Sequence, residues 1–399
     1  MKKFSSEKQK NKNNLQHPKT QSNISSTFKE GQKYPLKELV NKIKVGFVGS
    51  CNKYYCDSKN GIPMIRTTNL TDNGVNLENI KYVTEDFFNK NPKSQLHKGN
   101  ILIARHGNNG LASIWTHNFK AQCLNIVIIE PNEKIMNNYY LYYIFNSALV
   151  QRQIKAKVSG SVQGVINTKD ISEILIPYYK LDHQKKVSNV LLTMDTKIAL
   201  MEQKNKKIKY DVKNYLLSNL FVENKEEDIL SWNDEDLDNI SSISTGNCDL
   251  KDNIEDGKYP FFVRSEKVER IDSYAYDGEA ILIPGDGRVG QIFHYINGKF
   301  NYHQRVYKIS DFKDVIGKYV YYYLQQYFLR HVHKYSVKGT VDSLRLPIIK
   351  EMKIRYPSIK KQEKIVNILS CVDKKIELSN KQIDLMKNYK KGLLQKMFI

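Results

Sequence analysis

The chain has 399 residues, enough for two or three domains that each bury their own core. Its net charge of +21 favours a polyanionic partner, nucleic acid before a membrane, although a Lys-rich composition that serves only solubility is the alternative. No apolar run approaches the length of a membrane span, no signal-peptide core is present, and five scattered cysteines fit a reducing compartment. We therefore expect a cytoplasmic protein without a membrane partner.

The first part of the chain divides into a tail and a domain. Residues 1–30 are rich in Lys, Ser, Asn and Gln, which predicts a disordered basic tail. Residues 31–180 alternate short apolar runs with Gly, Asn and Asp turns, which predicts a β-rich globular domain. The expected strands lie at 63–70, 101–105 and 126–130, and a helix is expected at 140–157.

A long helix is predicted at 181–222, where apolar residues recur in alternating steps of four and three. This spacing keeps them on one face and is typical of a coiled coil. An acidic linker at 222–239 leads into a second domain at 223–357 and a second long helix at 358–399. Polar residues interrupt the two seams at Asn205 and Ser379. The clearest seam positions are Val187, Leu191, Met194, Ile198, Ile365, Leu369, Val372 and Ile376.

The second half of the chain repeats the first. Residues 171–200 match residues 349–378 at a constant offset of 178, as in Gln184 and Gln362, and beyond them "YLLSNLF" matches "GLLQKMF" after a one-residue slip. The domains match more loosely: "GIPMIR" returns as "GKYPFFVR", and "KGNILIARHGNNG" as "DGEAILIPGDGRVG". Two similar frames with different surfaces indicate two units that read different targets.

This order of domain, helix, domain, helix predicts the topology. If the two helices pair, they must be antiparallel, and each domain then lies at one end of a rod. We therefore expect an α+β protein, in which two β-rich domains flank an antiparallel two-helix coiled coil with pseudo-twofold symmetry.

No motif in the sequence indicates catalysis. "GDGRVG" at 285–290 has the glycine spacing of a dinucleotide site, but "QIFHYINGKF" follows it and predicts a strand where that site needs a helix. Cys51 and Cys56, and likewise His331 and His333, lack a second pair at metal-ligand spacing. We expect no cofactor or metal in this chain.

Polar and basic residues gather around the glycine turns of both domains. Arg and Lys suit guanine edges, Asn and Gln suit adenine edges, and Ser, Thr and Lys hold phosphates. For each single residue, stabilisation of a turn is the alternative role; the Tyr groups at 139–143 and 319–323 fit a helix core better than a stacking platform. The DNA-contact candidates are Arg66, Thr67, Thr68, Asn69, Arg105, His106, Asn108, Asn109, Ser159, Ser161, Gln163, Arg264, Ser265, Lys267, Arg288, His303, Gln304, Arg305, Lys338 and Thr340.

The chain resembles the specificity (S, HsdS) subunits of type I restriction–modification systems. The doubled signature at 159–198 and 338–376 carries the resemblance, together with "GKYPFFVRS" and "YHQRVY". The second copy departs from it, with Thr340-Val341-Asp342 in place of Ser161-Val162-Gln163, so a DNA role for that loop is safer in the first copy.

The resemblance implies a non-catalytic subunit with two target recognition domains that read one half each of a bipartite DNA site. It implies a helical spacer that sets the gap, two methyltransferase (M) subunits that carry S-adenosylmethionine, and restriction (R) subunits that use ATP and Mg. The alternatives are a specificity subunit of another DNA-modification or phage-defence system, and a coiled-coil adaptor that binds protein.

Overall fold

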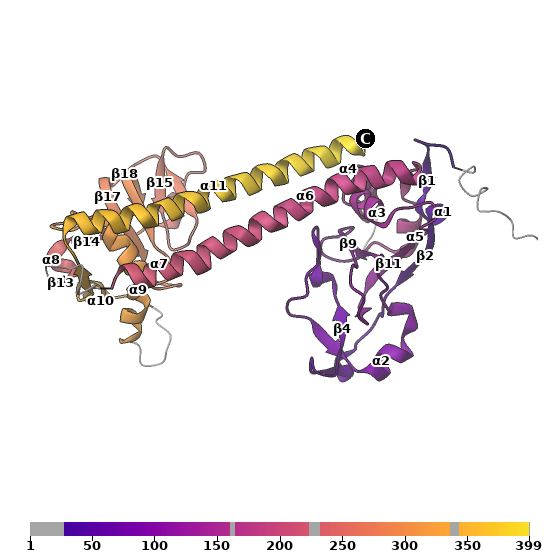
Figure 1. The fold of residues 1–399 in the computed structure, drawn as a ribbon, viewed down its shortest axis with the longest axis horizontal. Helices are drawn as coiled ribbons and strands as arrows, with labels where there is room; N and C mark the ends of the chain where they lie inside the picture. The colour runs from indigo at the N-terminus through magenta and orange to yellow at the C-terminus, as the bar shows by residue number, and fades with distance from the viewer. Residues whose placement is uncertain (1–27, 160–163, 223–231, 336–342, 399) are drawn as a thin grey trace, which may run out of the picture. The chain divides into compact units, whose positions relative to one another are not determined.

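The computed structural model describes residues 28–159, 164–222, 232–335 and 343–398. The predicted tail up to residue 27 and residues 223–231 of the acidic linker lie outside these ranges. The chain forms two compact units: unit 1 is Met1–Ala199 with Asp384–Ile399, and unit 2 is Leu200–Ile383. Each unit is mixed helix and sheet, which confirms the predicted α+β class (Figure 1).

Unit 1 is built on two four-stranded sheets, with strand orders β2-β11-β8-β9 and β10-β4-β7-β3, and two small ones, β1-β12 and β5-β6. Its strands are β1 (Lys33–Pro35), β2 (Val40–Val45), β3 (Tyr55–Cys56), β4 (Ile62–Ile65), β5 (Leu70–Thr71), β6 (Gly74–Val75), β7 (Lys81–Val83), β8 (Ile101–Ala104), β9 (Ala112–Ile114), β10 (Gln122–Cys123), β11 (Ile126–Pro131) and β12 (Leu175–Pro177). Its domain helices are α1 (Leu36–Leu39), η1 (Asn52–Tyr54), η2 (Thr67–Asn69), α2 (Glu85–Lys90), η3 (Pro92–Ser94), α3 (Asn138–Phe145), α4 (Ala148–Ser159) and α5 (Thr168–Ser172).

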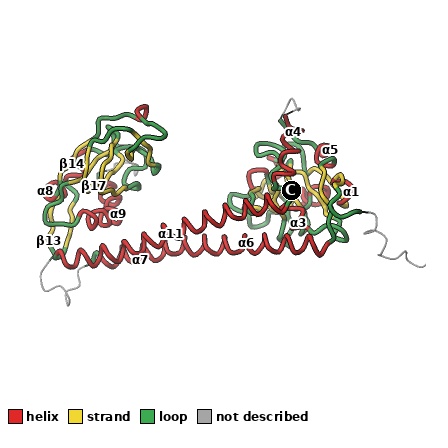
Figure 2. The backbone as a smooth tube through the Cα atoms, turned by 90° about the horizontal axis from the view of Figure 1, so that it is seen from above, coloured by secondary structure: helices red, strands yellow, loops and turns green. Residues whose placement is uncertain are grey.

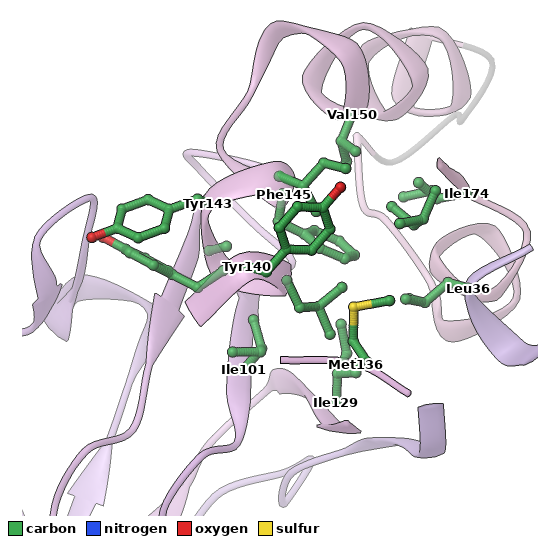
Figure 3. Packing of buried hydrophobic residues seen from close by; sticks show 14 of the residues in the cluster. Leu36, Ile101, Ile129, Met136, Tyr140, Tyr143, Phe145, Val150 and Ile174 are labelled. Atoms are coloured by element: carbon green, nitrogen blue, oxygen red, sulfur yellow. The ribbon is translucent and has the colours of Figure 1, made fainter. Parts of the chain in front are cut away.

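The main core of unit 1 forms where α3 and α4 cover the β2-β11-β8-β9 sheet. Ile101 and Ile129 of the sheet, Tyr140 and Phe145 of α3 and Val150 of α4 are all buried in one cluster (Figure 3). The Tyr residues of 139–143 that are fully buried belong to this core, as predicted.

The prediction of a single helix at 140–157 is wrong, because the helix is interrupted between α3 and α4. The Asn146 side chain accepts from the Ala112 amide and donates to the Ala112 carbonyl, and this bond to a strand ends α3. Ser147 is buried and donates to Ile144 O, which tightens the corner. Such side-chain bonds compete with helix continuation, and the sequence pattern alone does not reveal them.

Unit 2 has the same plan with a more continuous sheet of six strands, β14-β19-β17-β18-β15-β16, and a small sheet, β13-β20. Its strands are β13 (Asn233–Asp236), β14 (Ser242–Thr245), β15 (Tyr259–Phe262), β16 (Val268–Ile271), β17 (Tyr276–Pro284), β18 (His294–Tyr302), β19 (Val306–Ser310) and β20 (Lys353–Tyr356). Its domain helices are α8 (Leu237–Ile240), η5 (Leu250–Asp252), α9 (Gly317–His333) and α10 (Leu346–Lys350).

Strand β18 explains the difference between the two units. Its first part pairs with β17 and its end runs parallel to β15, so one strand joins both halves of the sheet. In unit 1 the two corresponding pieces, β9 and β10, are separate strands in separate sheets. The core of unit 2 lies under α9, where Tyr319, Tyr322 and Phe328 are fully buried.

The long helices begin at equivalent places. The first consists of α6 (Leu181–Lys207), a π-helical turn η4 (Ile208–Val212) and α7 (Lys213–Leu220), and the second is α11 (Ile359–Met397) (Figure 2). Gln184 and Gln362 are fully buried, and each Oε1 accepts a backbone N–H at the start of a domain helix, that of Asn137 or of Ile316. The repeated Gln therefore docks each long helix on the domain that precedes it.

Each unit also holds the far end of the other long helix through a Tyr–Asp–Lys triad. In unit 1, Asp195 accepts from the Tyr143 hydroxyl at 2.7 Å and pairs with Lys390 near the end of α11. In unit 2, Asp373 accepts from the Tyr322 hydroxyl at 2.8 Å and pairs with Lys213 of α7 at 2.7 Å. In both triads the Lys ammonium also lies 5.6 Å from the Tyr ring centroid, so the two units share the same set of interactions.

Most of the predicted seam residues are buried, and several of them pack into the domain cores. Val187 and Leu191 belong to the unit 1 core, and Ile365 and Leu369 belong to the unit 2 core. Met194 and Ile198 are buried, whereas Val372 and Ile376 are half-buried. The polar position Asn205 donates to Asn380, the neighbour of Ser379, across the helix pair within unit 2.

The π-helical turn accounts for the one-residue slip in the repeat. The offset between the copies is 178 at Asp195 and Asp373 but 177 at Lys213 and Lys390, so the first helix carries one extra residue. An extra residue in an α-helix would turn the following segment by about 100°. The π turn takes up the extra residue, and Lys213 still faces Asp373.

Deletion of Lys209 from the π turn is therefore expected to change the free energy of unfolding by less than about 1 kcal/mol, because a regular α-helix restores the phase of α7. The matched control deletes Asn388 from α11, where every turn is regular. That deletion rotates Lys390 away from Asp195 and is expected to cost at least about 2 kcal/mol. Thermal and urea unfolding measure both, and equal costs would contradict this role of the π turn.

Candidate nucleic-acid interface

In each unit, three segments meet at the ends of strands, and all of them except the one before β11 carry predicted contact residues. The segments follow β4, follow β8 and precede β11 in unit 1; they follow β15, follow β17 and precede β19 in unit 2. Residues that are up to 61 positions apart in sequence are hydrogen-bonded there, as Arg105 Nε is to Ile166 O at 3.3 Å. Two of the strands beneath these segments are neighbours in each unit, β8 and β11 or β17 and β19, and backbone hydrogen bonds join the third segment to them.

The same backbone bonds hold these segments together in both units. The Leu124 amide donates to Ile65 O at 2.8 Å, and the His303 amide donates to Phe262 O at 2.9 Å. The amide of the next residue, Asn125 in unit 1 and Gln304 in unit 2, also donates to a backbone carbonyl. This carbonyl lies just before η1 in unit 1 and just before η5 in unit 2. These segments and the backbone hydrogen bonds that join them form a loop frame. This loop frame is present in both units, although its side chains differ.

The glycine turn after β8 or β17 is also duplicated. Gly107 and Gly287 have φ of +72° and +77°, and Gly110 and Gly290 have φ of +85° and +70°. Glycine adopts these values without the strain that other residues incur. After Gly290 the chain enters β18 rather than a helix, so "GDGRVG" forms a β-turn, as predicted, and not a dinucleotide fingerprint.

In unit 1 the two candidate arginines, Arg66 and Arg105, donate to uncharged acceptors. Arg105 Nη1 donates to Asn125 Oδ1 at 2.7 Å, and His106 Nε2 lies 2.6 Å from Asn125 Nδ2. Arg66 is half-buried and its Nη2 donates to Asn79 O at 3.1 Å. Thr68, His106 and Asn108 are exposed, whereas Thr67 and Asn109 are half-buried, and Asn109 donates to Gly164 O.

In unit 2 three of the candidates, Arg264, Ser265 and His303, line a cleft of about 430 Å³ together with Asp286. Arg264 and Arg305 each donate from Nη1 to Asp286 Oδ2 at 3.0 Å. The remaining exposed candidates are held by neighbours on the same surface: Ser265 by Lys267 O, Lys267 by Glu269, Arg288 by Glu266, and Gln304 by Asp249.

Asp286 is the electrostatic centre of this group. Its partial burial acts to raise the pKa of its carboxyl, but the hydrogen bonds from Arg305 and Arg264 outweigh that effect and hold the pKa below its usual value. The carboxylate therefore stays ionised wherever the domain is folded near neutral pH, and it keeps both guanidinium groups in place.

Substitution of Asp286 by asparagine is expected to lower the thermal stability of unit 2 most at neutral pH. The native pKa lies below the unfolded value of about 3.9, so the charged carboxylate stabilises the fold fully above about pH 5, and this stabilisation is lost as pH falls through the native pKa. The gap in melting temperature between wild type and Asp286→Asn should narrow from pH 7 to pH 3. Glu266→Gln removes an exposed pair and serves as a control with a small effect; a gap that is constant with pH would refute the expectation.

Two candidates are corrected by their burial. Asn69 is 4% exposed; it accepts from the Arg66 amide and donates to Asn76 O, so it stabilises the turn instead of facing DNA. His303 is 3% exposed, and its Nδ1 accepts from the Arg305 amide at 2.9 Å, so its role is to hold Arg305. Four candidates lie outside the described residues, Ser161, Gln163, Lys338 and Thr340, and of Ser159 only its place at the end of α4 is described.

The structure adds two residues that the sequence analysis did not select. Asn125 joins Arg105 to His106, and Asp286 joins Arg264 to Arg305. Asn125 has a positive φ of 54°, a value that Asn tolerates better than most residues, so an Asn between two apolar runs was the available signal. For Asp286 no local signal existed, because both partners are distant in sequence.

The sequence profile of the "Type I restriction modification DNA specificity domain" family matches this chain twice, at residues 29–210 and 230–388. The two matches fall on the two halves of the internal repeat and cover most of the chain. The chain belongs to this family and is a type I restriction–modification specificity subunit.

Named relatives agree with this membership. The chain is 27% identical over 169 residues to the type I restriction enzyme EcoDI specificity subunit of Escherichia coli, a match that spans 41% of this chain and 37% of that protein. It is 21% identical over 407 residues to the putative type I restriction enzyme MjaX specificity subunit of Methanocaldococcus jannaschii, covering 90% of both.

Solved structures show the same fold. The S subunit of a type I restriction–modification system from M. genitalium aligns with a TM-score of 0.57 and 17% identity, over 92% of this chain and 96% of that one. A chain from a study of complex assembly and conformational transition of the type I R-M system aligns with a TM-score of 0.59 and 14% identity, over 93% and 99%. Within the described ranges, no helix is both long enough and apolar enough to cross a membrane.

Proposed function

We propose that each domain reads one half of an asymmetric, bipartite DNA site and that the paired long helices set the gap between the halves. The observation that carries this proposal is the duplicated loop frame with unlike side chains: Arg105, His106 and Asn125 in unit 1, and Arg264, Arg305 and Asp286 in unit 2. Because the two loop frames are similar, we expect both domains to dock on the DNA duplex in a similar way. Because their side chains differ, we expect the two domains to contact different bases.

The long helices support the spacer role. The starts of both helices are docked on their own domains by Gln184 and Gln362, and the ends are held by the Tyr–Asp–Lys triads. Because each triad joins a helix end to a domain, we infer that the helical length between these contacts sets the gap between the half-sites. A net charge of +21 further supports a DNA partner, since phosphate contacts supply much of the affinity.

The proposal assigns the chemistry to other chains. Two methyltransferase subunits would bring S-adenosylmethionine, and restriction subunits would bring ATP and Mg. This chain would supply recognition and spacing only, in the cytoplasm. Its membership in the specificity family supports this division of labour.

A methylome tests the proposal. The chain would be expressed with its methyltransferase subunit in a methylation-free host, and N6-methyladenine would be mapped across the genome. Two short specific blocks around a fixed non-specific gap are the expected result. A single continuous motif would contradict two independent reading domains.

A protein-binding adaptor is the remaining alternative, and salt separates it from the proposal. Many Lys and Arg contacts to phosphates make DNA affinity fall steeply as salt rises, whereas an adaptor predicts weak affinity that changes little with salt. Titration of the purified complex on duplex DNA at several salt concentrations distinguishes the two.

A further inference from the structure

We propose that the half-site read by unit 2 contains guanine, contacted in the major groove by Arg264 and Arg305, with Asp286 as the residue that positions both. This inference rests on the proposed function, in which unit 2 reads one half of the DNA site. It goes further because it names a base and the residues that select it.

The geometry begins with one carboxylate oxygen between two guanidinium groups. Asp286 Oδ2 accepts from Arg264 Nη1 and from Arg305 Nη1, each at 3.0 Å. The three residues come from three separate segments, after β15, after β17 and before β19. The Asp286 side chain is 18% exposed, while those of Arg264 and Arg305 are 45% and 65% exposed. The carboxylate is thus part of the frame, and both arginines extend from it toward solvent.

The contacts with Asp286 leave most of each arginine fork available. A guanidinium has five N–H donors, and Asp286 occupies only Nη1 of each group. In the described part of the chain, no other hydrogen bond from these two guanidinium groups is found. Guanine presents two acceptors, N7 and O6, side by side in the major groove, and an arginine fork matches both. Adenine presents a donor at N6 in the same place and would meet the fork with a donor.

The surrounding charge favours a base edge over a phosphate. Asp286 and Glu269 both line the cleft beside Arg264, and Glu266 lies against the nearby Arg288. These carboxylates would repel a phosphate, whereas a neutral guanine edge carries no such penalty. Arginines that serve only phosphates have no need of a partly buried carboxylate behind them.

Prior fixation of the two side chains adds selectivity. An unrestrained arginine loses rotamer freedom when it binds, and a side chain that is already held loses less. His303 contributes to the same end, because its buried Nδ1 holds the Arg305 amide at 2.9 Å. Unit 1 lacks this arrangement: Arg66 and Arg105 donate to carbonyl oxygens and to Asn125. The inference is therefore confined to unit 2.

The test selects bound duplexes from random DNA with the full chain in complex with its methyltransferase subunit. Wild type is compared with Arg264→Lys, Arg305→Lys and Asp286→Asn. Lysine keeps the positive charge and any phosphate contact but loses the fork. The matched control is Arg270→Lys in β16, whose guanidinium donates to Gly257 O and Lys258 O and so serves the fold. Melting curves confirm that each variant is folded.

The expected result is a wild-type motif with a G·C pair in one half-site. Preference for that pair should fall by about 5- to 150-fold in at least one Arg→Lys variant, while the other half-site stays unchanged. Asp286→Asn should weaken the same preference, and Arg270→Lys should not. The salt dependence of affinity should remain that of wild type, since the charge is retained.

Two outcomes overturn the inference and leave the proposed function standing. One is a split motif with no guanine on either strand of the half-site that responds to unit 2 variants. The other is a guanine preference that both Arg→Lys variants preserve. A motif that is not split at all would instead refute the proposed function, so the two failures are distinguishable.

Discussion

Replacement of Gly246 by alanine is expected to destabilise unit 2 by about 3 kcal/mol or more and to abolish sequence preference in one half-site. A Cβ at this position would lie 1.9 Å from Tyr302 O and 2.9 Å from His303 O. Both are backbone atoms of the segment that carries Arg305, so no side chain can move aside. The loop frame itself must shift, and the arginines shift with it.

Circular dichroism and calorimetry of the full chain measure the loss, and the methylome shows which half-site becomes degenerate. Gly46→Ala makes the corresponding change in unit 1, where a Cβ would lie 2.5 Å from Cys123 O, and should affect the other half-site. The control is Gly392→Ala in α11, where a Cβ meets nothing within 4 Å; it should stabilise the helix by about 0.5–1 kcal/mol. A Gly246→Ala protein that melts like wild type would contradict the close approach.

Insertion of three heptads into both long helices is expected to lengthen the non-specific gap by about nine base pairs. Three heptads add about 31 Å of helix, close to one turn of DNA at about 34–36 Å, so both half-sites would still face the same side of the duplex. Whole heptads also keep the seam on one face. We would place the insertions after Leu200 and Leu378, which are equivalent, exposed positions of the repeat.

Both long helices must receive an insertion of the same length. Lys213 and Lys390 hold the helix ends to Asp373 and Asp195, so a change in one helix alone cannot satisfy both triads. A single insertion is therefore expected to cost stability, by about 3 kcal/mol, without giving a new defined gap. Methylome mapping reads the gap for the paired and the single variants. An unchanged gap in the paired variant would refute the spacer role.

The repeat, the long helices and the glycine turns could all be predicted from the sequence. Helix and strand periodicity depend on neighbours a few residues away, and the offset of 178 depends only on residue identity. The one-residue slip was visible as well, but its physical form as a π turn at Ile208–Val212 was not. The π turn keeps Lys213 and Leu217 in phase with their partners in unit 2, and these partners are distant in sequence.

Tertiary structure alone decided which polar residues serve recognition and which serve the fold. Asn69 and Arg264 look alike as candidates in the sequence, yet Asn69 is buried with its hydrogen bonds made, and Arg264 extends from Asp286 into solvent. Asp286 and Arg305 are 19 residues apart, and Asp195 and Lys390 are 195 apart, so no local pattern links them. The sequence by itself determined that the domain is duplicated and that a long helix follows each copy, because the repeat depends on residue identity and the helices on local periodicity. The differences between the two reading surfaces arise from contacts across the sheet, which exist only once the strands are paired.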